Sequence, residues 1–187
     1  MKAVVETSVT SKDSAPLPKT VVTLGWVSFL TDVASEMIVS LLPAFLASLG
    51  TAPALALGWI EGVAESTSAA VKIGSGRISD RLARRKPLVV FGYSVSALAR
   101  PLIGFATLWP AILAIRFLDR IGKGVRSAPR DALIAEVTPP ERRGAAYGLH
   151  RAFDNAGAVL GPLLAAALLG FLEVPLRTVF LLSAVPG

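Results

Sequence analysis

A basic loop separates two long apolar segments of the chain: Gly76-Arg77-Ile78-Ser79-Asp80-Arg81-Leu82-Ala83-Arg84-Arg85-Lys86. An acidic side chain at a helix end, followed by a cationic loop, can join neighbouring helix ends through charge-assisted hydrogen bonds. Basic loops are also common on the cytoplasmic side of membrane proteins in general. The charges of this loop alone therefore do not choose between a specialised loop and an ordinary cytoplasmic one.

The composition is that of a membrane protein. Hydrophobic residues make up 53% of the 187 residues and charged residues only 17%, whereas soluble domains have about a quarter charged residues. A membrane-spanning helix needs about 20 mostly apolar residues. The apolar segments predict an all-α transmembrane helix bundle with helices over residues 21–49, 54–79, 87–106, 111–137, 144–172 and 176–187.

The sixth segment is shorter than the others. Twelve residues of helix extend about 18 Å, and the hydrocarbon core of a bilayer is about 30 Å thick. We therefore expect the sixth helix to be incomplete in this chain, that is, truncated.

The loops predict an orientation. Basic residues follow the second and fourth segments, whereas the turns after the first and third contain no Lys or Arg. The positive-inside rule then places the N-terminus in the cytoplasm of a multi-pass protein of the cell inner (plasma) membrane. We expect residues 1–20 to be a disordered cytoplasmic terminus, and Trp59 and Trp109 to lie near the opposite surface. The basic residues concerned are Arg81, Arg84, Arg85, Lys86, Arg142 and Arg143.

Five of the six apolar segments contain ionisable residues at bilayer depth, where such residues are costly and usually functional. Counted at 1.5 Å per residue from the nearer surface, Asp32, Arg120 and Asp154 each lie about 15–17 Å deep. We expect these three side chains to face one water-accessible cavity. The alternative is that each acid is permanently paired with a basic residue. The ionisable residues are Asp32, Glu36, Glu61, Glu65, Arg100, Arg116, Asp119, Arg120 and Asp154.

The fourth segment has the spacing of an ion-pair ladder. Arg116 and Asp119 are three residues apart, and Asp119 and Lys123 are four apart, so each pair can meet on one helix face. Such a ladder can serve transport or be purely structural. We expect this segment to unwind at Pro129 near its cytoplasmic end.

The charged residues of the other segments are less informative. Glu61 and Glu65 can be paired or can line a vestibule. His150, the single histidine, is more typical of a packed residue than of a proton relay. No partner for Arg100 is evident in the sequence.

Several functions are excluded by what the sequence lacks. It contains no cysteine, no metal-ligand cluster, no nucleophile elbow and no phosphate loop. We therefore expect no enzymatic activity, no catalytic residue, no metal and no cofactor. The net charge of +6 falls within and between apolar segments, which favours anionic membrane lipid over nucleic acid as its partner.

The fifth segment contains Gly157-Ala158-Val159-Leu160-Gly161-Pro162. Small residues four apart allow helices to pack closely in a membrane, and a proline inside a helix bends it. Plain helix packing is sufficient to explain this string.

Taken together, these strings resemble the sequence motifs of the major facilitator superfamily. The basic loop is similar to motif A between helices two and three, with Ala83 in place of the second glycine. Arg116-Phe117-Leu118-Asp119-Arg120-Ile121-Gly122 is similar to the helix-four motif, with Asp119 and Arg120 in place of Gln and Gly. The string at Gly157 is similar to motif C of many proton-coupled exporters. The matching motif A positions are Gly76, Asp80, Arg81, Arg84 and Arg85, and the motif C positions are Gly157, Gly161 and Pro162.

The resemblance implies the N-terminal half of a twelve-helix secondary transporter, built of two three-helix repeats, whose partner is the C-terminal six-helix half. It implies alternating access and proton-coupled export of a small organic solute, with motif A controlling the conformational change. Proton-coupled uptake and a non-transporting scaffold or receptor remain alternatives. The expected proton and substrate pathway consists of Asp32, Glu36, Arg116, Asp119, Arg120 and Asp154.

Overall fold

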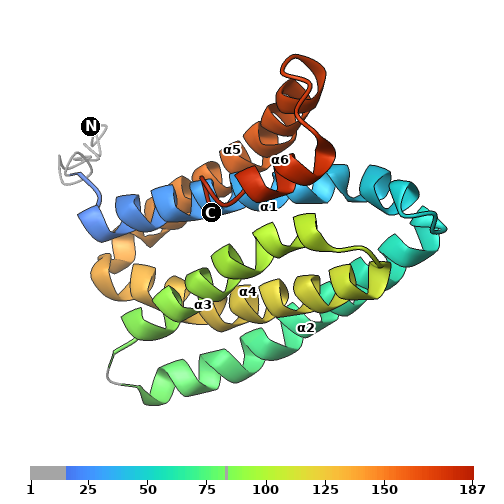
Figure 1. The fold of residues 1–187 in the computed structure, drawn as a ribbon. Helices are drawn as coiled ribbons and strands as arrows, with labels where there is room; N and C mark the ends of the chain where they lie inside the picture. Colours follow the sequence, from blue (N-terminus) through green and yellow to red (C-terminus); the bar gives the residue numbers. More distant parts are fainter. Residues whose placement is uncertain (1–15, 83) are drawn as a thin grey trace, which may run out of the picture.

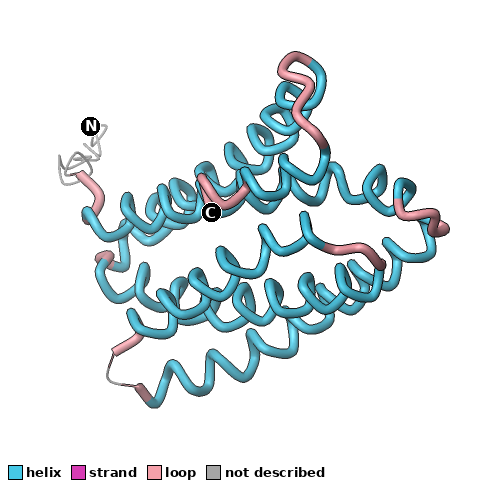
Figure 2. Tube along the Cα trace, in the orientation of Figure 1, coloured by secondary structure: helices cyan, strands magenta, loops and turns pink. Residues whose placement is uncertain are grey.

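The computed structural model describes residues 16–82 and 84–187, and this part of the chain is a bundle of helices without strands (Figures 1 and 2). The predicted all-α fold class is therefore confirmed. The predicted disorder of residues 1–20 falls largely on residues outside the described ones, except that Lys19 and Thr20 already belong to the first helix. The elements are α1 (Lys19–Ser48), α2 (Pro53–Arg81), α3 (Lys86–Ala99), η2 (Arg100–Phe105), α4 (Trp109–Val137), η3 (Pro140–Arg142), α5 (Arg143–Gly170) and α6 (Leu176–Leu182).

The helices form two groups. The helix α1 packs along α5, and α4 packs along both α2 and α3. Figure 1 shows α1, α5 and α6 on one side of the bundle and α2, α3 and α4 on the other. The short helices α6 and η2 contact each other across the two groups.

The turn between α1 and α2 shows why the first helix stops. Gly50 has a φ of +70°, a left-handed conformation that glycine adopts without a steric penalty. The amide groups of Gly50 and Thr51 bond back to the carbonyls of Ala47 and Leu46 at 3.0 and 3.4 Å. This pairing satisfies carbonyls at the helix end that would otherwise have no partner.

Two prolines act differently from the sequence-based expectations. The third segment is α-helical only as far as Ala99, and Arg100–Phe105 continues as a 3-10 helix that contains Pro101 near its start. The expected unwinding of the fourth segment at Pro129 is wrong, because α4 runs through this residue to Val137. A single proline removes only one backbone hydrogen bond, and the surrounding turns of α4 remain helical.

The apolar core of the described residues has three parts, of which one packs α1, α5 and α6 around Val33 and Val179. A second cluster packs residues of α1, α2, η2, α4 and α6 around Phe45 and Phe180. A third packs α1, α3, α4 and α5 around Val21 and Ile134. Along α4, the buried charged residues lie between the cluster around Phe45 and the cluster around Val21. The polar layer therefore has apolar packing on both sides of it along this helix.

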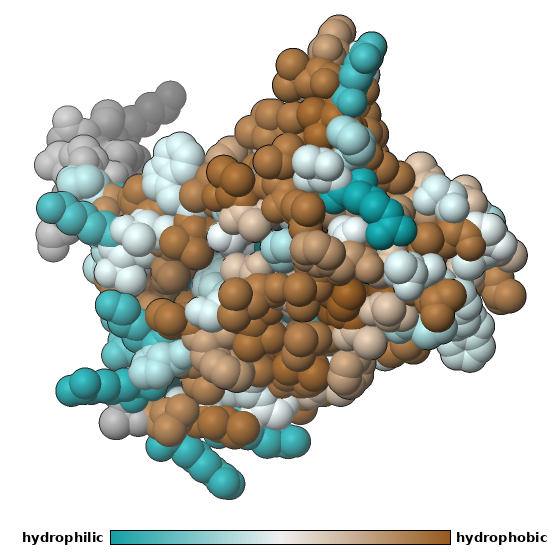
Figure 3. Space-filling view, viewed as in Figure 1, coloured by the Kyte–Doolittle hydropathy of each residue, from teal (hydrophilic) through white to brown (hydrophobic). Residues whose placement is uncertain are grey.

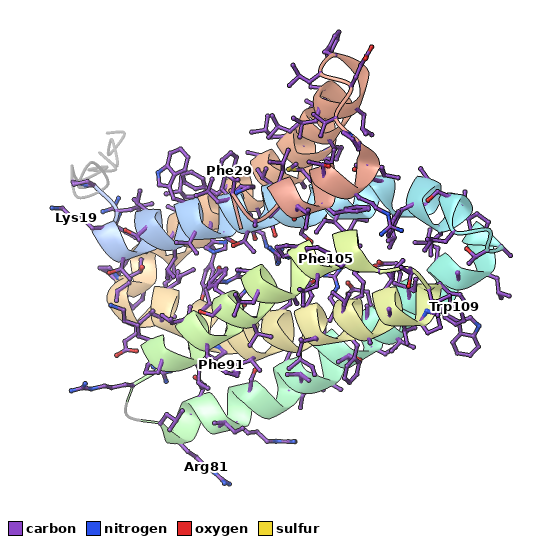
Figure 4. All side chains as sticks on the ribbon, in the orientation of Figure 1. Lys19, Phe29, Arg81, Phe91, Phe105 and Trp109 are labelled. Carbon is purple, nitrogen blue, oxygen red and sulfur yellow. The ribbon has the colours of Figure 1, made fainter. Side chains whose placement is uncertain are left out.

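The charged loops lie at one end of the molecule. Figure 4 shows Lys19 and Arg81 at one end of the bundle and Trp109 at the other. Hydrophilic surface gathers at the first end, and most of the remaining face of Figure 3 is apolar. Exposed apolar side chains of α3 and α5, such as Phe91, Leu98, Val159 and Leu163, are typical of lipid-facing surface.

Three described helical stretches are long and apolar enough to span a membrane by length and composition: Lys19–Ser48, Lys86–Phe105 and Pro140–Gly170. The helices α2 and α4 are each 29 residues long, but they carry most of the ionisable residues of the polar layer.

Candidate functional site: a buried charged layer around α4

One face of α4 carries most of its charged side chains. Successive residues of an α-helix are turned by about 100°, so residues 116, 119, 120, 123, 126 and 130 fall within about a third of the circumference. Arg116 is 0% exposed and Asp119 1% exposed, whereas Phe117 and Leu118 on the other side are exposed. The charged face of α4 is therefore turned into the bundle and its apolar face outward.

Asp119 is the centre of the largest ion-pair network. Its Oδ1 accepts a hydrogen bond from Arg100 Nε at 3.0 Å, and its Oδ2 accepts one from Arg116 Nη1 at 3.4 Å. Arg100 also donates from Nη1 to the backbone carbonyl of Thr31 in α1 at 3.0 Å. Both oxygens of this buried carboxylate are thus engaged, as the cost of burying a charge requires.

The network continues into α2. Arg116 donates to Glu61 Oε1 from Nη2 at 2.6 Å and from Nε at 3.1 Å. Arg120 Nη2 lies 3.6 Å from Glu61 Oε2 and 3.4 Å from Glu65 Oε1. Side chains of α2, η2 and α4 and a backbone group of α1 are therefore connected through charged contacts.

A second charged group lies between α1, α4 and α5. Asp32 of α1 lies within electrostatic reach of Asp154 of α5 and of Arg126 and Lys123 of α4. His150 Nδ1 is 3.3 Å from Asp154 Oδ1, although neither this carboxylate oxygen nor His150 Nε2 has a hydrogen-bond partner among the described residues.

The predicted pathway residues are thus distributed between two groups. Asp154 lies close enough to Asp32 to act on it electrostatically, so these two belong to the second group. Arg120 is directed to the carboxylates of α2, in the group that also contains Arg116 and Asp119.

Glu36 lies half-buried at the contact of α1 with α5. It forms no ion pair with another described residue.

The glycines of the fifth segment lie at the contact between α5 and α1. A Cβ atom added at Gly157 would be 2.6 Å from the carbonyl oxygen of Phe29 and 3.0 Å from Asp32 Cβ. One added at Gly161 would be 2.7 Å from the carbonyl oxygen of Val33. Pro162 lies inside α5, which continues to Gly170. These glycines set the distance between the two helices that carry Asp32 and Asp154.

Glycines of α3 and α4 bring α4 equally close to its neighbours. A Cβ at Gly122 would be 2.6 Å from the carbonyl oxygen of Gly92, and one at Gly124 would be 2.9 Å from that of Ser68. Ser75 Oγ donates to the carbonyl of Gly124 at 2.8 Å. The backbone of α4 is therefore in direct contact with both α2 and α3.

The basic loop extends into solvent at the end of the bundle. Asp80, Arg81 and Arg84 are exposed. A Cβ atom added at Gly76 would lie 3.6 Å from Ala128 Cβ, which is an ordinary contact distance. Arg85 Nη1 forms an ion pair with Glu136 Oε2 of α4 at 2.6 Å. Apart from that ion pair, the described charges of the loop are directed away from this bundle.

Sequence reasoning did not identify the partners of several residues of the charged layer. Arg100 was without an evident partner, and Glu61 was only one of two acids that could be paired. Arg126, which is 4% exposed, donates to Ser96 Oγ at 2.7 Å and lies 4.3 Å above the ring of Tyr93. The signal for Arg100 that the sequence did contain was its place inside an apolar segment, immediately before Pro101. No cluster of three or more His, Asp or Glu side chains that could hold a metal ion is present in residues 16–82 and 84–187.

The fold and this charged layer define the chain as a multi-pass helical membrane protein with a polar interior. The family model for the Major Facilitator Superfamily matches residues 24–187. The chain belongs to this superfamily, as the sequence motifs predicted.

Curated relatives agree with this assignment. The chain is 37% identical over 177 residues to the uncharacterized MFS-type transporter MJ1317 of Methanocaldococcus jannaschii, covering 95% of this chain and 44% of that protein. It is 34% identical over 131 residues to the multidrug resistance protein MdtH of Photorhabdus laumondii, covering 68% of this chain and 31% of MdtH. The chain thus spans less than half the length of these relatives.

The fold is also similar to a solved structure. A bacterial homologue of the human lysosomal transporter Spinster, in an inward-facing and unoccupied conformation, matches with a TM-score of 0.74 at 18% identity. The match covers 90% of this chain and 40% of that chain. At this identity the comparison establishes the fold alone.

Proposed function

We propose that this chain is the N-terminal half of a secondary transporter that exports a small organic solute in exchange for protons. Its partner is a C-terminal six-helix half, and the substrate passes between the halves by alternating access. The protein lies in the cell inner membrane with its N-terminus in the cytoplasm, since its basic loops share one end of the bundle.

The observation that carries this proposal is that Asp32 and Asp154 lie within electrostatic reach of each other. Both carboxylates lie on helices of the polar layer, and neither forms an ion pair with Lys or Arg among the described residues. A carboxylate without a fixed cationic partner can bind and release a proton, as the acidic residues of membrane pumps and transporters do. One of these two is the coupling site.

Export is favoured over uptake by two similarities. The Gly157 string is similar to the exporter motif C, and MdtH is described as a multidrug resistance protein. The exposed charges of Asp80, Arg81 and Arg84 at the end of the bundle are available to the other half, which supports a motif A role in closing the cytoplasmic side.

The test is a proton-flux assay on the full-length protein in liposomes that contain a pH-sensitive dye. Small organic anions, cations and neutral solutes are added outside in turn. In an antiporter, solute entry drives protons out and the lumen becomes alkaline; in a symporter the lumen becomes acidic. Protein-free liposomes correct for passive permeation of weak acids and bases.

We expect an alkaline signal with at least one solute, and its loss in Asp32→Asn or Asp154→Asn. Glu141→Gln, at an exposed carboxylate of η3, is the matched control and should retain the signal. An acidic signal would assign uptake instead of export. Activity that survives both Asp32→Asn and Asp154→Asn would remove these residues from proton coupling.

A further inference from the structure

The charged face of α4 contains one ammonium group that the ion-pair network does not use. Lys123 is four residues from Asp119, so the sequence suggests that they pair. In the structure both oxygens of Asp119 are occupied by Arg100 and Arg116. The Lys123 ammonium group forms no hydrogen bond or ion pair with a described residue.

Most of the other carboxylates near the charged face of α4 are engaged elsewhere. Glu61 and Glu65 contact Arg116 and Arg120. Asp131 accepts two hydrogen bonds from Arg130 at 3.2 and 3.0 Å. Asp154 faces His150. Glu65 and Asp32 both act on Lys123 electrostatically, but neither forms an ion pair with it within 4 Å.

The backbone contacts of α4 with its neighbours determine which face of the helix carries the side chain of Lys123. Gly122 contacts α3 and Gly124 contacts α2, and the intervening residue is turned by about 100° from each. Lys123 therefore lies on the same face of α4 as Arg116 and Arg130, and this face is directed into the polar layer. It is half-buried, so it keeps some access to the space beside α4.

A half-buried ammonium group without a direct ion-pair partner loses hydration that more distant carboxylates replace only in part, and a bound anion would compensate the rest. A flexible lysine suits this role, because it presents three hydrogen-bond donors on a mobile stem. Building on the proposed transport function, we propose that Lys123 binds the anionic group of the transported solute, and that the substrate is a small organic anion carrying a carboxylate or a phosphate.

The neighbouring residues support an anion at this place. Arg126, also on this face, donates to a neutral serine and stacks on Tyr93, and it has no carboxylate ligand among the described residues. Asp32 is within electrostatic reach of both cations. Asp32 forms no ion pair with either cation, so neither is neutralised by direct contact with this carboxylate.

The experiment measures thermal unfolding of the full-length protein in phosphatidylcholine nanodiscs. The probes are benzoate, succinate and glycerol 3-phosphate, compared with the neutral benzamide, succinamide and glycerol. At least one anion should raise the unfolding midpoint, and its neutral counterpart should not. In Lys123→Gln the apparent Kd for that anion should weaken by about tenfold or more, because a charge-assisted hydrogen bond is lost.

Two further variants separate the charge from folding effects. Lys123→Arg should retain binding, since it keeps a cation at this position. Lys19→Gln, at an exposed lysine at the start of α1, should bind as the unmodified protein does. Equal stabilisation by neutral and anionic probes, or unchanged anion binding in Lys123→Gln, would overturn the proposal. Where Lys123→Gln does not fold, equal stabilisation of the unmodified protein by neutral and anionic probes still overturns the proposal.

Two other outcomes are distinguishable. The unfolding measurement is repeated in nanodiscs that also contain phosphatidylglycerol. If this lipid alone stabilises the protein, and Lys123→Gln removes the effect, a lipid headgroup occupies the site and the proposal of a soluble substrate is overturned. Lys123-dependent anion binding without any proton signal in liposomes would refute proton coupling but support the anion site.

Discussion

Asp119→Asn tests whether the buried network stabilises the bundle. The substitution keeps the shape of the side chain but removes the negative charge between Arg100 and Arg116, which are 3% and 0% exposed. Removing one partner of a buried ion pair costs about 3–5 kcal/mol, because the remaining charge stays buried and uncompensated. On the scale of a domain of about 150–250 residues, this lowers the unfolding midpoint by about 6–20 °C.

The assay is thermal unfolding of the purified protein in one detergent. Glu136→Gln is the matched control, because it removes a carboxylate from the Arg85 pair, whose side chains are 26% and 59% exposed. An exposed pair contributes at most about 1 kcal/mol. In a background of Arg100→Met, Asp119→Asn should cost at least about 1 kcal/mol less, since residues in one network couple. Equal losses in Asp119→Asn and Glu136→Gln would refute the reasoning.

Three further predictions concern packing, gating and a helix contact. Gly157→Ala should destabilise the protein by about 1–3 kcal/mol, because its Cβ would overlap a backbone carbonyl of α1. The control is Gly148→Ala on the same helix, where an added Cβ meets nothing within 4 Å, and it should be neutral or stabilising. Equal unfolding midpoints of the two variants would contradict this. Asp80→Asn should leave the unfolding midpoint unchanged but reduce proton-coupled flux in liposomes severalfold, since this exposed carboxylate is available to the other half; unchanged flux would exclude a gating role. Tyr147→Phe removes the 2.8 Å hydrogen bond to the carbonyl of Asp131 and should cost about 1 kcal/mol of unfolding free energy, measured by denaturant titration; a cost near zero would show that water replaces the hydroxyl.

The fold class was accessible from the sequence because long apolar segments and their charged loops are properties of contiguous residues. The pair formed by Arg116 and Asp119 was accessible for the same reason, since a three-residue spacing on one helix brings them together. Its observed separation of 3.4 Å confirms that contact.

The rest of the charged layer depends on how separate helices are turned. Arg100 meets Asp119 only because α3 and α4 approach at Gly92 and Gly122, which no spacing within one segment reveals. Counting residues from the membrane surface gave the height of Arg120 but not the side of α4 on which it lies, and the structure directs it to α2.

The glycine contacts of α4 and α5 have a consequence for how this protein can change over time. Bare backbone, and not the ionisable side chains, sets how near the neighbouring helices stand. A replacement at Lys123 or Asp32 therefore need not alter the spacing of the scaffold, whereas any side chain gained at Gly122 or Gly157 must push two helices apart. Cargo preference can diversify through the former positions while the architecture stays constant through the latter.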